Sequence, residues 1–207
     1  DCFLKAFPRA QYPDVRLEFK TRLNILGQGE GRIPAMKDDR VTVFNGTWSV
    51  QQMYDWLCRA DAYLFPTKGE GYGMPPREAM ATGLPIMFTD CSGLKELANQ
   101  QYNYPIPVKR YEDCPLGGKW AIPDMDYCIE TMRWMYYNRE AAYKKGTAGA
   151  AWLQKEWSRI PIATRFKEVI DSVDPESATH FTGVTERRII ESRIQHKAFY
   201  TYIKKHF

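Results

Sequence analysis

Two glutamates, Glu70 and Glu78, enclose a glycine-rich loop in the stretch FPTKGEGYGMPPREAMATGLP, residues 65–85. Glycine at alternate positions removes side chains where a ligand would approach backbone N–H groups. The pattern predicts that a helix begins at Pro75, and a helix N-terminus favours a phosphate because its N–H groups are unpaired and partly positive. Because neither residue of the Pro-Pro pair has an N–H, the amides that could bind an anion lie upstream, in residues 71–74.

The two carboxylates need a separate explanation, because a carboxylate beside a phosphate would repel it. A carboxylate accepts hydrogen bonds from hydroxyl groups, so a sugar or a ribose diol is the natural partner for Glu70 and Glu78. Two interpretations remain open on the residues alone. The stretch is either a site for a phosphorylated sugar compound, or an ordinary connection into a helix whose first turn favours Glu through its dipole.

The elements around this loop predict an α/β fold with a parallel sheet covered by helices on both faces. Short apolar strands alternate with helical segments, which is the βαβ pattern. The strands are expected at 15–19, 41–44, 62–65 and 85–88, and helices at 50–60, 75–82 and 92–98. In such a sheet ligands bind beyond the carboxyl ends of the strands. The loop at 66–73 follows the strand 62–65, so its position is that of a binding site.

The remainder of the chain is expected to be irregular at first and then helical. Residues 101–123 are rich in Pro, Tyr and Gly and predict an irregular surface excursion. Helical segments fill 124–171, and a polar break separates them from a basic helix at 185–206. The opening DCFLKAF has helical spacing without an N-cap before it, so we expect further residues upstream.

Composition argues against several classes of protein. Hydrophobic residues make up 44% of the chain and charged residues 26%, which indicates a globular core rather than disorder. The net charge is only +4 and the basic residues are spread along the chain, so we expect no nucleic-acid partner. Five cysteines without a CxxC pair favour neither a disulfide framework nor a zinc site, and they predict a cytoplasmic protein.

The stretch EGYGMPPRE resembles the E-x7-E signature of the retaining GT-B glycosyltransferases of family four. AMATGLPIMFTDCSGLKE follows it, and VTVFNGTWS and ADAYLFPT precede it in the order expected for that family. The resemblance covers residues 1–171 and implies the C-terminal, donor-binding half of a GT-B fold, with a Rossmann-like parallel sheet. It also implies a nucleotide-diphosphate sugar as donor substrate, a UDP- or GDP-sugar, and no cofactor.

The same resemblance implies a role for each residue of the signature. Glu70 would be the catalytic carboxylate that holds hydroxyls of the donor sugar, and Glu78 would accept hydrogen bonds from the ribose. The amides that would face the sugar and the pyrophosphate are those of Gly71, Tyr72, Gly73 and Met74. No metal site is expected, because the predicted cleft has no DxD-like acidic pair.

The base of the nucleotide would contact the turn that contains Thr47 and Trp48, largely through backbone atoms. Backbone contacts leave no mark on side-chain choice, so the turn does not identify the base. Tyr72 stands where many relatives have Phe, which is a conservative difference.

Two parts of such an enzyme are not expected in this chain. The family's phosphate-clamping Arg and Lys lie just before the helix that opens this sequence, although Lys20 and Lys68 are cations close to the predicted site. The family's N-terminal acceptor-binding domain also lies upstream. We therefore predict an N-terminally truncated donor-binding domain over 1–171, catalytically incomplete by itself. A basic helical tail over 172–207 is expected to dock on a neighbouring protein rather than on a membrane.

Other functions remain open for the same pattern. The chain could be a non-catalytic nucleotide-sugar-binding module that acts with a partner chain. Another GT-B enzyme, a nucleotide-sugar epimerase or a phosphorylase, is a further alternative. The complete E-x7-E spacing argues against the epimerase, and the lack of a pyridoxal-binding lysine motif argues against the phosphorylase.

Overall fold

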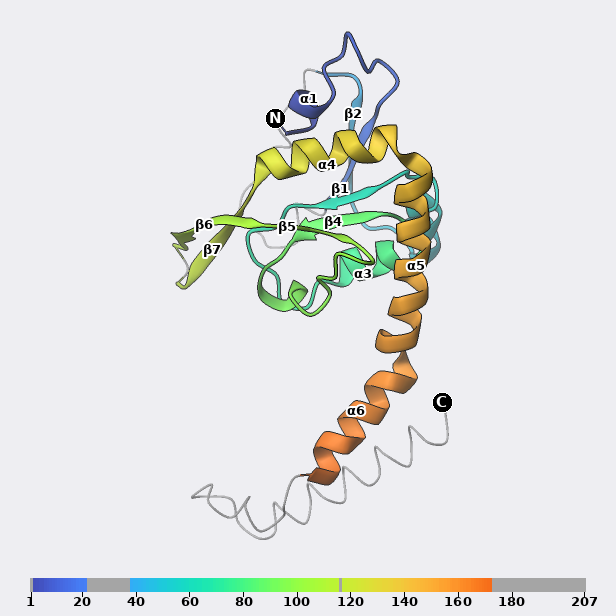
Figure 1. Ribbon diagram of the computed structural model, residues 1–207, viewed down its shortest axis with the longest axis vertical. Coiled ribbons are helices and arrows are strands. Elements are labelled where there is room, and N and C mark those ends of the chain that lie inside the picture. Colours follow the sequence, from blue (N-terminus) through green and yellow to red (C-terminus); the bar gives the residue numbers. More distant parts are fainter. Residues whose placement is uncertain (1, 22–37, 116, 173–207) are drawn as a thin grey trace. The chain divides into compact units, whose positions relative to one another are not determined.

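The computed structural model describes residues 2–21, 38–115 and 117–172 of the chain (Figure 1). It divides the chain into two compact units, Asp1–Ser158 and Arg159–Phe207. The predicted binding loop and all the described strands belong to the first unit. The first unit is therefore the part of the molecule that positions the site.

The second unit is described only over one helix, α6 (Arg159–Ser172). The tail predicted over 172–207, apart from its first residue, lies outside the described residues. None of the helices that the structure describes combines the length and the apolar character needed to cross a bilayer.

Parallel strand pairing forms the frame of the first unit. One pair consists of β1 (Leu17–Thr21) and β2 (Val41–Asn45). A three-stranded sheet has the order β3-β4-β5 and consists of β3 (Tyr63–Phe65), β4 (Ile86–Thr89) and β5 (Tyr104–Ile106). Both are parallel throughout, as the alternation of strands and helices in the sequence predicts.

Helices cover both faces of the three-stranded sheet, with α4 along one face and α3 along the other (Figure 1). α3 also packs against α5, and α1 packs against α4. The helices of the first unit are α1 (Cys2–Ala6), α2 (Val50–Leu57), α3 (Met74–Ala81), α4 (Met125–Tyr137) and α5 (Arg139–Trp157).

β4 shows why the sheet must be covered on both sides, because all four of its residues are buried. Ile86 and Phe88 pack into a core that includes Met80 of α3. Met87 packs into a second core, which includes Cys128 of α4. Successive side chains of a strand point to opposite faces, so a continuous apolar strand requires a hydrophobic layer on each face. This confirms the predicted fold class.

The N-terminal segment is joined to the first unit by an aromatic core and one buried cation. Phe3, Phe7 and Tyr12 are buried together, and Tyr136 of α4 packs against them. Arg40 is 1% exposed and its guanidinium lies 5.3 Å from the centre of the Phe3 ring. These contacts fix α1 and the start of β2 to α4.

Most of the predicted elements before residue 98 are confirmed, with small differences at their ends. The predicted cap Ser49 accepts a hydrogen bond from the Gln52 N–H at 3.2 Å, and Gln52 returns one to the Ser49 N–H, which forms a capping box. The helix expected at 92–98 is shorter, because only Ser92–Leu94 form a 3₁₀ turn, η1. The helices expected over 124–171 are present as α4, α5 and α6.

The expectation of an irregular excursion at 101–123 was wrong. This region contains β5 and an antiparallel hairpin of β6 (Val108–Asp113) and β7 (Lys119–Pro123). β5 is a buried strand of three residues with a proline at its centre, and it lies at the edge of the sheet, where a missing N–H is tolerated. The proline content of this region therefore led to a prediction of irregular structure where β5 is a strand.

Candidate functional site

The loop between the two glutamates lies where a parallel sheet binds ligands. Residues 66–73, here called the glutamate loop, leave the carboxyl end of β3 and lead directly into α3. β3 pairs in parallel with β4, and Phe65 lies opposite Phe88 at that end. The loop after β4, which includes η1, leaves the same edge of the sheet. Two loops of adjacent strands therefore form the site together.

The start of α3 presents backbone donors to this edge. Gly73 is the N-cap residue, with a left-handed φ of +76° and no side-chain cap. Within the described part of the chain, the N–H groups of Tyr72, Gly73 and Met74 donate no hydrogen bond. Three neighbouring donors at the positive end of a helix form a suitable cradle for an anion such as a diphosphate.

The loop after β4 supports the glutamate loop from beneath. The N–H of Gly93 donates to the carbonyl of Glu70 at 3.2 Å, and the Glu70 N–H donates to the Ser92 hydroxyl at 3.4 Å. The approach is so close that a Cβ on Gly93 would lie 1.6 Å from the carbonyl oxygen of Gly71. Ser92 has a φ of +49°, in the left-handed region that serine rarely adopts. The strained serine and the glycine after it determine how closely the glutamate loop packs against the loop after β4.

Gly73 is also required by its neighbours. A Cβ on Gly73 would lie 2.2 Å from Cδ2 of Leu94, a side chain that is fully buried. A Cβ on Gly71, in contrast, would meet nothing within 4 Å. Gly73 is thus needed for the fold of the loop, whereas Gly71 leaves open space beside the unpaired amides.

The two glutamates differ in their surroundings. Glu70 is half-buried, and its Oε1 accepts a hydrogen bond from the N–H of Gly71 at 3.0 Å. That amide, which was predicted to face the ligand, is therefore paired with the Glu70 carboxylate in this structure. Glu78 is exposed and lies one turn into α3. Burial, and then the charges of Glu78 and Glu70, raise the pKa of Tyr63 on β3, which places both carboxylates within electrostatic range of one phenol.

The turn predicted to contact a base joins β2 to α2. Thr47 is exposed, and the Trp48 ring packs against Phe44 at 5.2 Å and against Trp56 at 5.7 Å between ring centroids. The ring is used for packing, which leaves the backbone of the turn for contacts with a ligand. No hydrogen bond within the described residues joins this turn to the glutamate loop.

Lys20 lies beside this turn, at the end of β1. Its Nζ donates to the carbonyl of Thr21 at 3.0 Å and to that of Gly46, and it lies 4.9 Å from the centre of a Trp48 ring. Lys68, the other cation near the predicted site, is in the glutamate loop and lies 4.9 Å from the centre of a ring of Trp120. The Lys68 carbonyl accepts a hydrogen bond from Ala121 at 2.8 Å, so the β6–β7 hairpin is joined to the loop. This contact was missed because no hairpin was predicted.

Arg77 is a further residue that the sequence reasoning missed. It lies in the first turn of α3, directly before Glu78, and is 6% exposed. A cation in the first turn of a helix opposes the helix dipole, and this unfavourable placement was the signal available in the sequence. Its guanidinium stacks on Tyr72 in the glutamate loop and on Trp157 at the end of α5.

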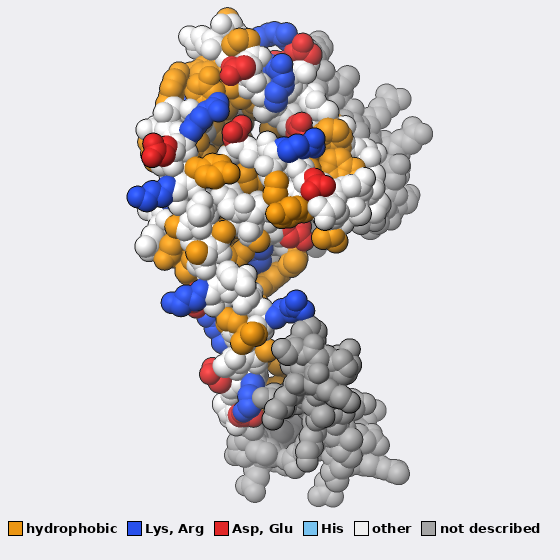
Figure 2. All heavy atoms as spheres, turned by 90° about the vertical axis from the view of Figure 1, so that its right-hand side faces the viewer, with side chains coloured by type: hydrophobic (Ala, Val, Ile, Leu, Met, Phe, Trp, Pro, Cys, Tyr) orange, Lys and Arg blue, Asp and Glu red, His pale blue; other side chains and the backbone are white. Residues whose placement is uncertain are grey.

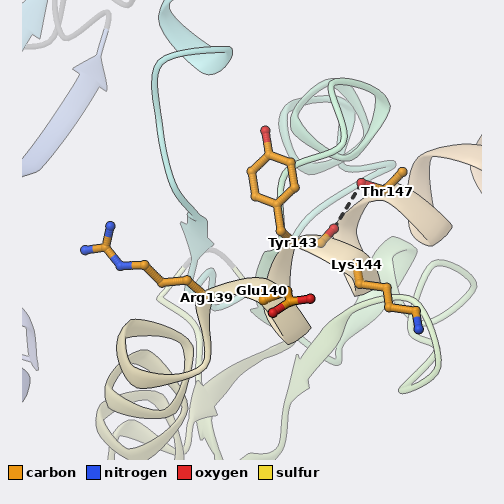
Figure 3. Close-up of a pocket in the computed structure, with 5 residues that line it drawn as sticks. All are labelled: Arg139, Glu140, Tyr143, Lys144 and Thr147. Carbon is orange, nitrogen blue, oxygen red and sulfur yellow. Dashed lines mark hydrogen bonds between the residues drawn. The ribbon is translucent and has the colours of Figure 1, made fainter.

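Two surface hollows lie away from the glutamate loop. One, of about 650 Å³, is lined by residues of α5 that spread away from one another along the helix (Figure 3). They are Arg139, Glu140, Tyr143, Lys144 and Thr147. The face of the molecule on which α5 lies shows Lys and Arg interspersed with Asp and Glu, without a continuous charged area (Figure 2). The diverging side chains make this hollow a poor candidate for a site.

Comparison with known proteins identifies the family. Residues 1–113, more than half of the chain, match the family described as Glycosyl transferases group 1. The chain belongs to this family. The match includes both loops of the candidate site and the turn at Thr47 and Trp48.

Curated relatives from the same comparison match shorter stretches. The chain is 44% identical over 43 residues to the lipopolysaccharide core biosynthesis mannosyltransferase LpsB of Rhizobium meliloti, covering 21% of this chain and 12% of that protein. It is 32% identical over 87 residues to the putative glycosyltransferase 41 of a Sulfolobus islandicus filamentous virus, covering 42% of this chain and 25% of that protein. The chain thus spans a quarter or less of the length of these relatives.

Solved structures show the fold. Anabaena HepE in complex with UDP-glucose is similar with a TM-score of 0.52 and 12% identity, over 66% of this chain and 33% of that one. Sucrose-phosphate synthase of Thermosynechococcus elongatus is similar with a TM-score of 0.52 and 19% identity, over 64% of this chain and 30% of that one. Glycosyltransferase domains of the GT-B class therefore share the mixed α/β arrangement of this chain.

Proposed function

We propose that this chain is the donor-binding domain of a retaining GT-B glycosyltransferase of family four. It would bind a UDP- or GDP-sugar and act with an N-terminal acceptor-binding domain. The observation that supports this most strongly is the set of unpaired amides at Tyr72, Gly73 and Met74, which lies between two carboxylates at the carboxyl edge of the sheet. A diphosphate matches the amides, and the hydroxyls of two sugars match the carboxylates.

The proposed chemistry assigns separate tasks to the parts of the site. The amides and the dipole of α3 bind the diphosphate and stabilise the negative charge that it gains as it leaves the sugar, without a metal ion. Glu70 binds hydroxyls of the donor sugar, and Glu78 binds the ribose. If Glu70 turns towards the sugar and releases the N–H of Gly71, that N–H becomes a fourth donor for the ligand.

The nucleotide would extend from Glu78 towards the turn at Thr47 and Trp48. Backbone groups of this turn would contact the base, with Lys20 as a nearby cation that can approach a phosphate or a ribose. The UDP-glucose complex of Anabaena HepE supports a UDP-sugar as the first donor to test, and the mannosyltransferase name of LpsB supports a hexose.

The proposal is tested by calorimetry with UDP, GDP, UDP-glucose and GDP-mannose on the full chain and its variants. We expect Glu78→Ala to weaken binding of the free nucleoside diphosphate about tenfold, because hydrogen bonds between a carboxylate and the ribose are lost. Glu70→Ala should leave diphosphate affinity unchanged or slightly improved, since it frees the Gly71 amide, and should abolish the additional affinity that the sugar provides.

Glu140→Ala is the matched control, because Glu140 is an exposed glutamate of α5 outside the site. It should bind every probe as the unaltered chain does. Equal losses in the Glu70 and Glu78 variants would contradict the separate roles. No binding of any of the four probes would overturn the proposed function itself.

A further inference from the structure

Arg77 is held between two aromatic rings behind the glutamate loop. Its guanidinium carbon lies 4.1 Å from the centre of the Tyr72 ring and 4.4 Å from that of a Trp157 ring. The side chain is 6% exposed. A guanidinium is planar and stacks on aromatic faces, so the two rings fix both its position and its orientation.

The hydrogen bonds of Arg77 are few for a buried charge. Nε donates to the carbonyl of Tyr72 at 3.2 Å, whereas both terminal nitrogens are buried and have no hydrogen-bond partner among the described residues. Burial lowers the pKa of Arg77, and electrostatic interactions with Tyr72 and Glu96 oppose this only in part. A buried cation with unpaired donors costs stability, and an apolar side chain of similar shape would often be equal or better there. Stability is therefore a poor explanation for arginine at this position.

The hydrogen bond from Nε of Arg77 is made to the anion cradle. The carbonyl of Tyr72 and the N–H of Gly73 belong to one planar trans peptide, so they point in opposite directions. When Nε of Arg77 holds the Tyr72 carbonyl, the Gly73 N–H of the same peptide points away from Arg77. Gly73, with its left-handed φ of +76°, joins this peptide to the unpaired N–H of Met74 at the start of α3.

Trp157 connects Arg77, and through it the Tyr72 carbonyl, to the end of α5. It is the last residue of α5, and α5 packs along α3. The ring of Trp157 contacts the same guanidinium as the ring of Tyr72. Arg77 is thus held by a residue outside the glutamate loop. The position of the end of α5 therefore influences the orientation of the loop.

We propose that Arg77 is a positioning residue of the donor site: it aims the amides of Gly73 and Met74 at the donor diphosphate by holding the Tyr72 carbonyl. This inference rests on the proposed function, because the diphosphate is the ligand assumed there. Arg77 does not touch the donor in this arrangement. Its charge is of secondary importance, and its planar Nε donor is the essential feature.

The test compares Arg77→Met and Arg77→Lys with the unaltered full chain. Methionine fills similar space without a donor, and lysine keeps the charge without a planar Nε group. Nitrogen-15 relaxation without ligand reports the order of the Gly73 and Met74 amides, thermal unfolding reports stability, and calorimetry with UDP and GDP reports affinity. Arg139→Met is the control, since Arg139 also stacks on a tyrosine, Tyr136, but is exposed on α5.

We expect Arg77→Met to keep or raise the unfolding temperature, to lower the order of both amides, and to weaken diphosphate binding about tenfold. Arg77→Lys should show the same loss of order, whereas Arg139→Met should change neither order nor affinity. Unchanged amide order in Arg77→Met would overturn the proposal, as would full recovery in Arg77→Lys.

A general loss of stability with loosening throughout α3 and α5 would also overturn it, because that is the signature of a structural role alone. If the unaltered chain binds neither UDP nor GDP, the proposed function fails. The relaxation measurement then still decides whether Arg77 orders these amides, since it requires no ligand.

Discussion

At the scale of single residues, Gly93 determines how closely the two loops of the site approach each other. Its missing Cβ would lie 1.6 Å from the carbonyl oxygen and 2.6 Å from the carbonyl carbon of Gly71. We expect Gly93→Ala to lower the free energy of unfolding by about 1–3 kcal/mol, as forced displacement of packed atoms does. It should also weaken UDP or GDP binding, because the backbone around Gly71 must move. Denaturant unfolding and calorimetry measure the two effects.

Gly71→Ala is the comparison for Gly93→Ala, because Gly71 is the residue that Gly93 approaches. A Cβ at Gly71 meets no atom within 4 Å, so the free energy of unfolding should stay close to that of the unaltered chain. The added methyl group would nevertheless stand in the open space beside the amides and reduce affinity. If Gly93→Ala were as stable as Gly71→Ala, the loop after β4 would not support the glutamate loop as described.

The residues of the site divide into those that a sequence reveals and those that only a fold brings together. Glu70, Gly73 and Glu78 could be proposed as site residues from the sequence, because they lie close together in one segment. The contact of Arg77 with Trp157 could not, because it depends on how α5 lies against α3. The same holds for Gly93, whose role is set by a neighbouring loop rather than by its own segment.

At the scale of elements, periodicity predicted most strands and helices before residue 98 because their apolar residues recur at strand or helix spacing. β4 is buried at every position, so its continuous apolar run was unambiguous. β5 has only three residues and includes Pro105, and β6 of the hairpin is largely polar. Short edge strands and exposed hairpins carry little hydrophobic signal, and this is why 101–123 was mistaken for an irregular segment.

The packing of α5 gives a test of how α3 is held. A Cβ on Gly146 would lie 2.4 Å from the carbonyl oxygen of Gly83 and 2.6 Å from the nitrogen of Pro85, in the turn between α3 and β4. Replacing glycine by alanine inside a helix usually stabilises it by about 0.5–1 kcal/mol. We expect the opposite here, a loss of about 1–3 kcal/mol for Gly146→Ala in denaturant unfolding, because the clash is with backbone.

Ala148→Gly is the reference for that measurement, since Ala148 is exposed on the same helix. It should cost about 0.5–1 kcal/mol through helix propensity alone. A stabilising Gly146→Ala would show that α5 does not rest on the 83–85 turn. In that case α5 would not give α3, and with it the anion cradle, a fixed position.

At the scale of the whole first unit, Arg40 joins segments that are distant in the sequence. Its guanidinium is paired with Asp38 at 2.7 Å, and one terminal nitrogen donates to the carbonyls of Phe7 at 3.0 Å and Tyr12 at 2.8 Å. The arginine thereby connects the end of α1, the segment after it and the start of β2. Loss of its partner charge would leave a buried cation and loosen all three.

The pH dependence of stability follows from this pair. Hydrogen bonds from the Arg40 side chain and backbone lower the pKa of Asp38 from 3.8 to about 2. A carboxyl whose pKa is lowered in the folded state contributes stability above its unfolded pKa and loses it on protonation. We expect stability to decline as the pH falls from 3.8 to about 2, as followed by denaturant unfolding at each pH. The Asp38→Asn variant should be less stable at neutral pH. Its free energy of unfolding should also change less across the same acidic pH range.

Asp39→Asn separates this effect from that of an exposed ion pair. The Arg9 side chain lowers the pKa of Asp39 through a hydrogen bond, but Asp39 and Arg9 are 71% and 60% exposed. Solvent screens such a pair, so its variant should keep most of the acid dependence of the unaltered chain. If the two asparagine variants gave the same profile, the buried guanidinium of Arg40 would not be the cause. The acid sensitivity of the N-terminal segment would then arise from surface charge.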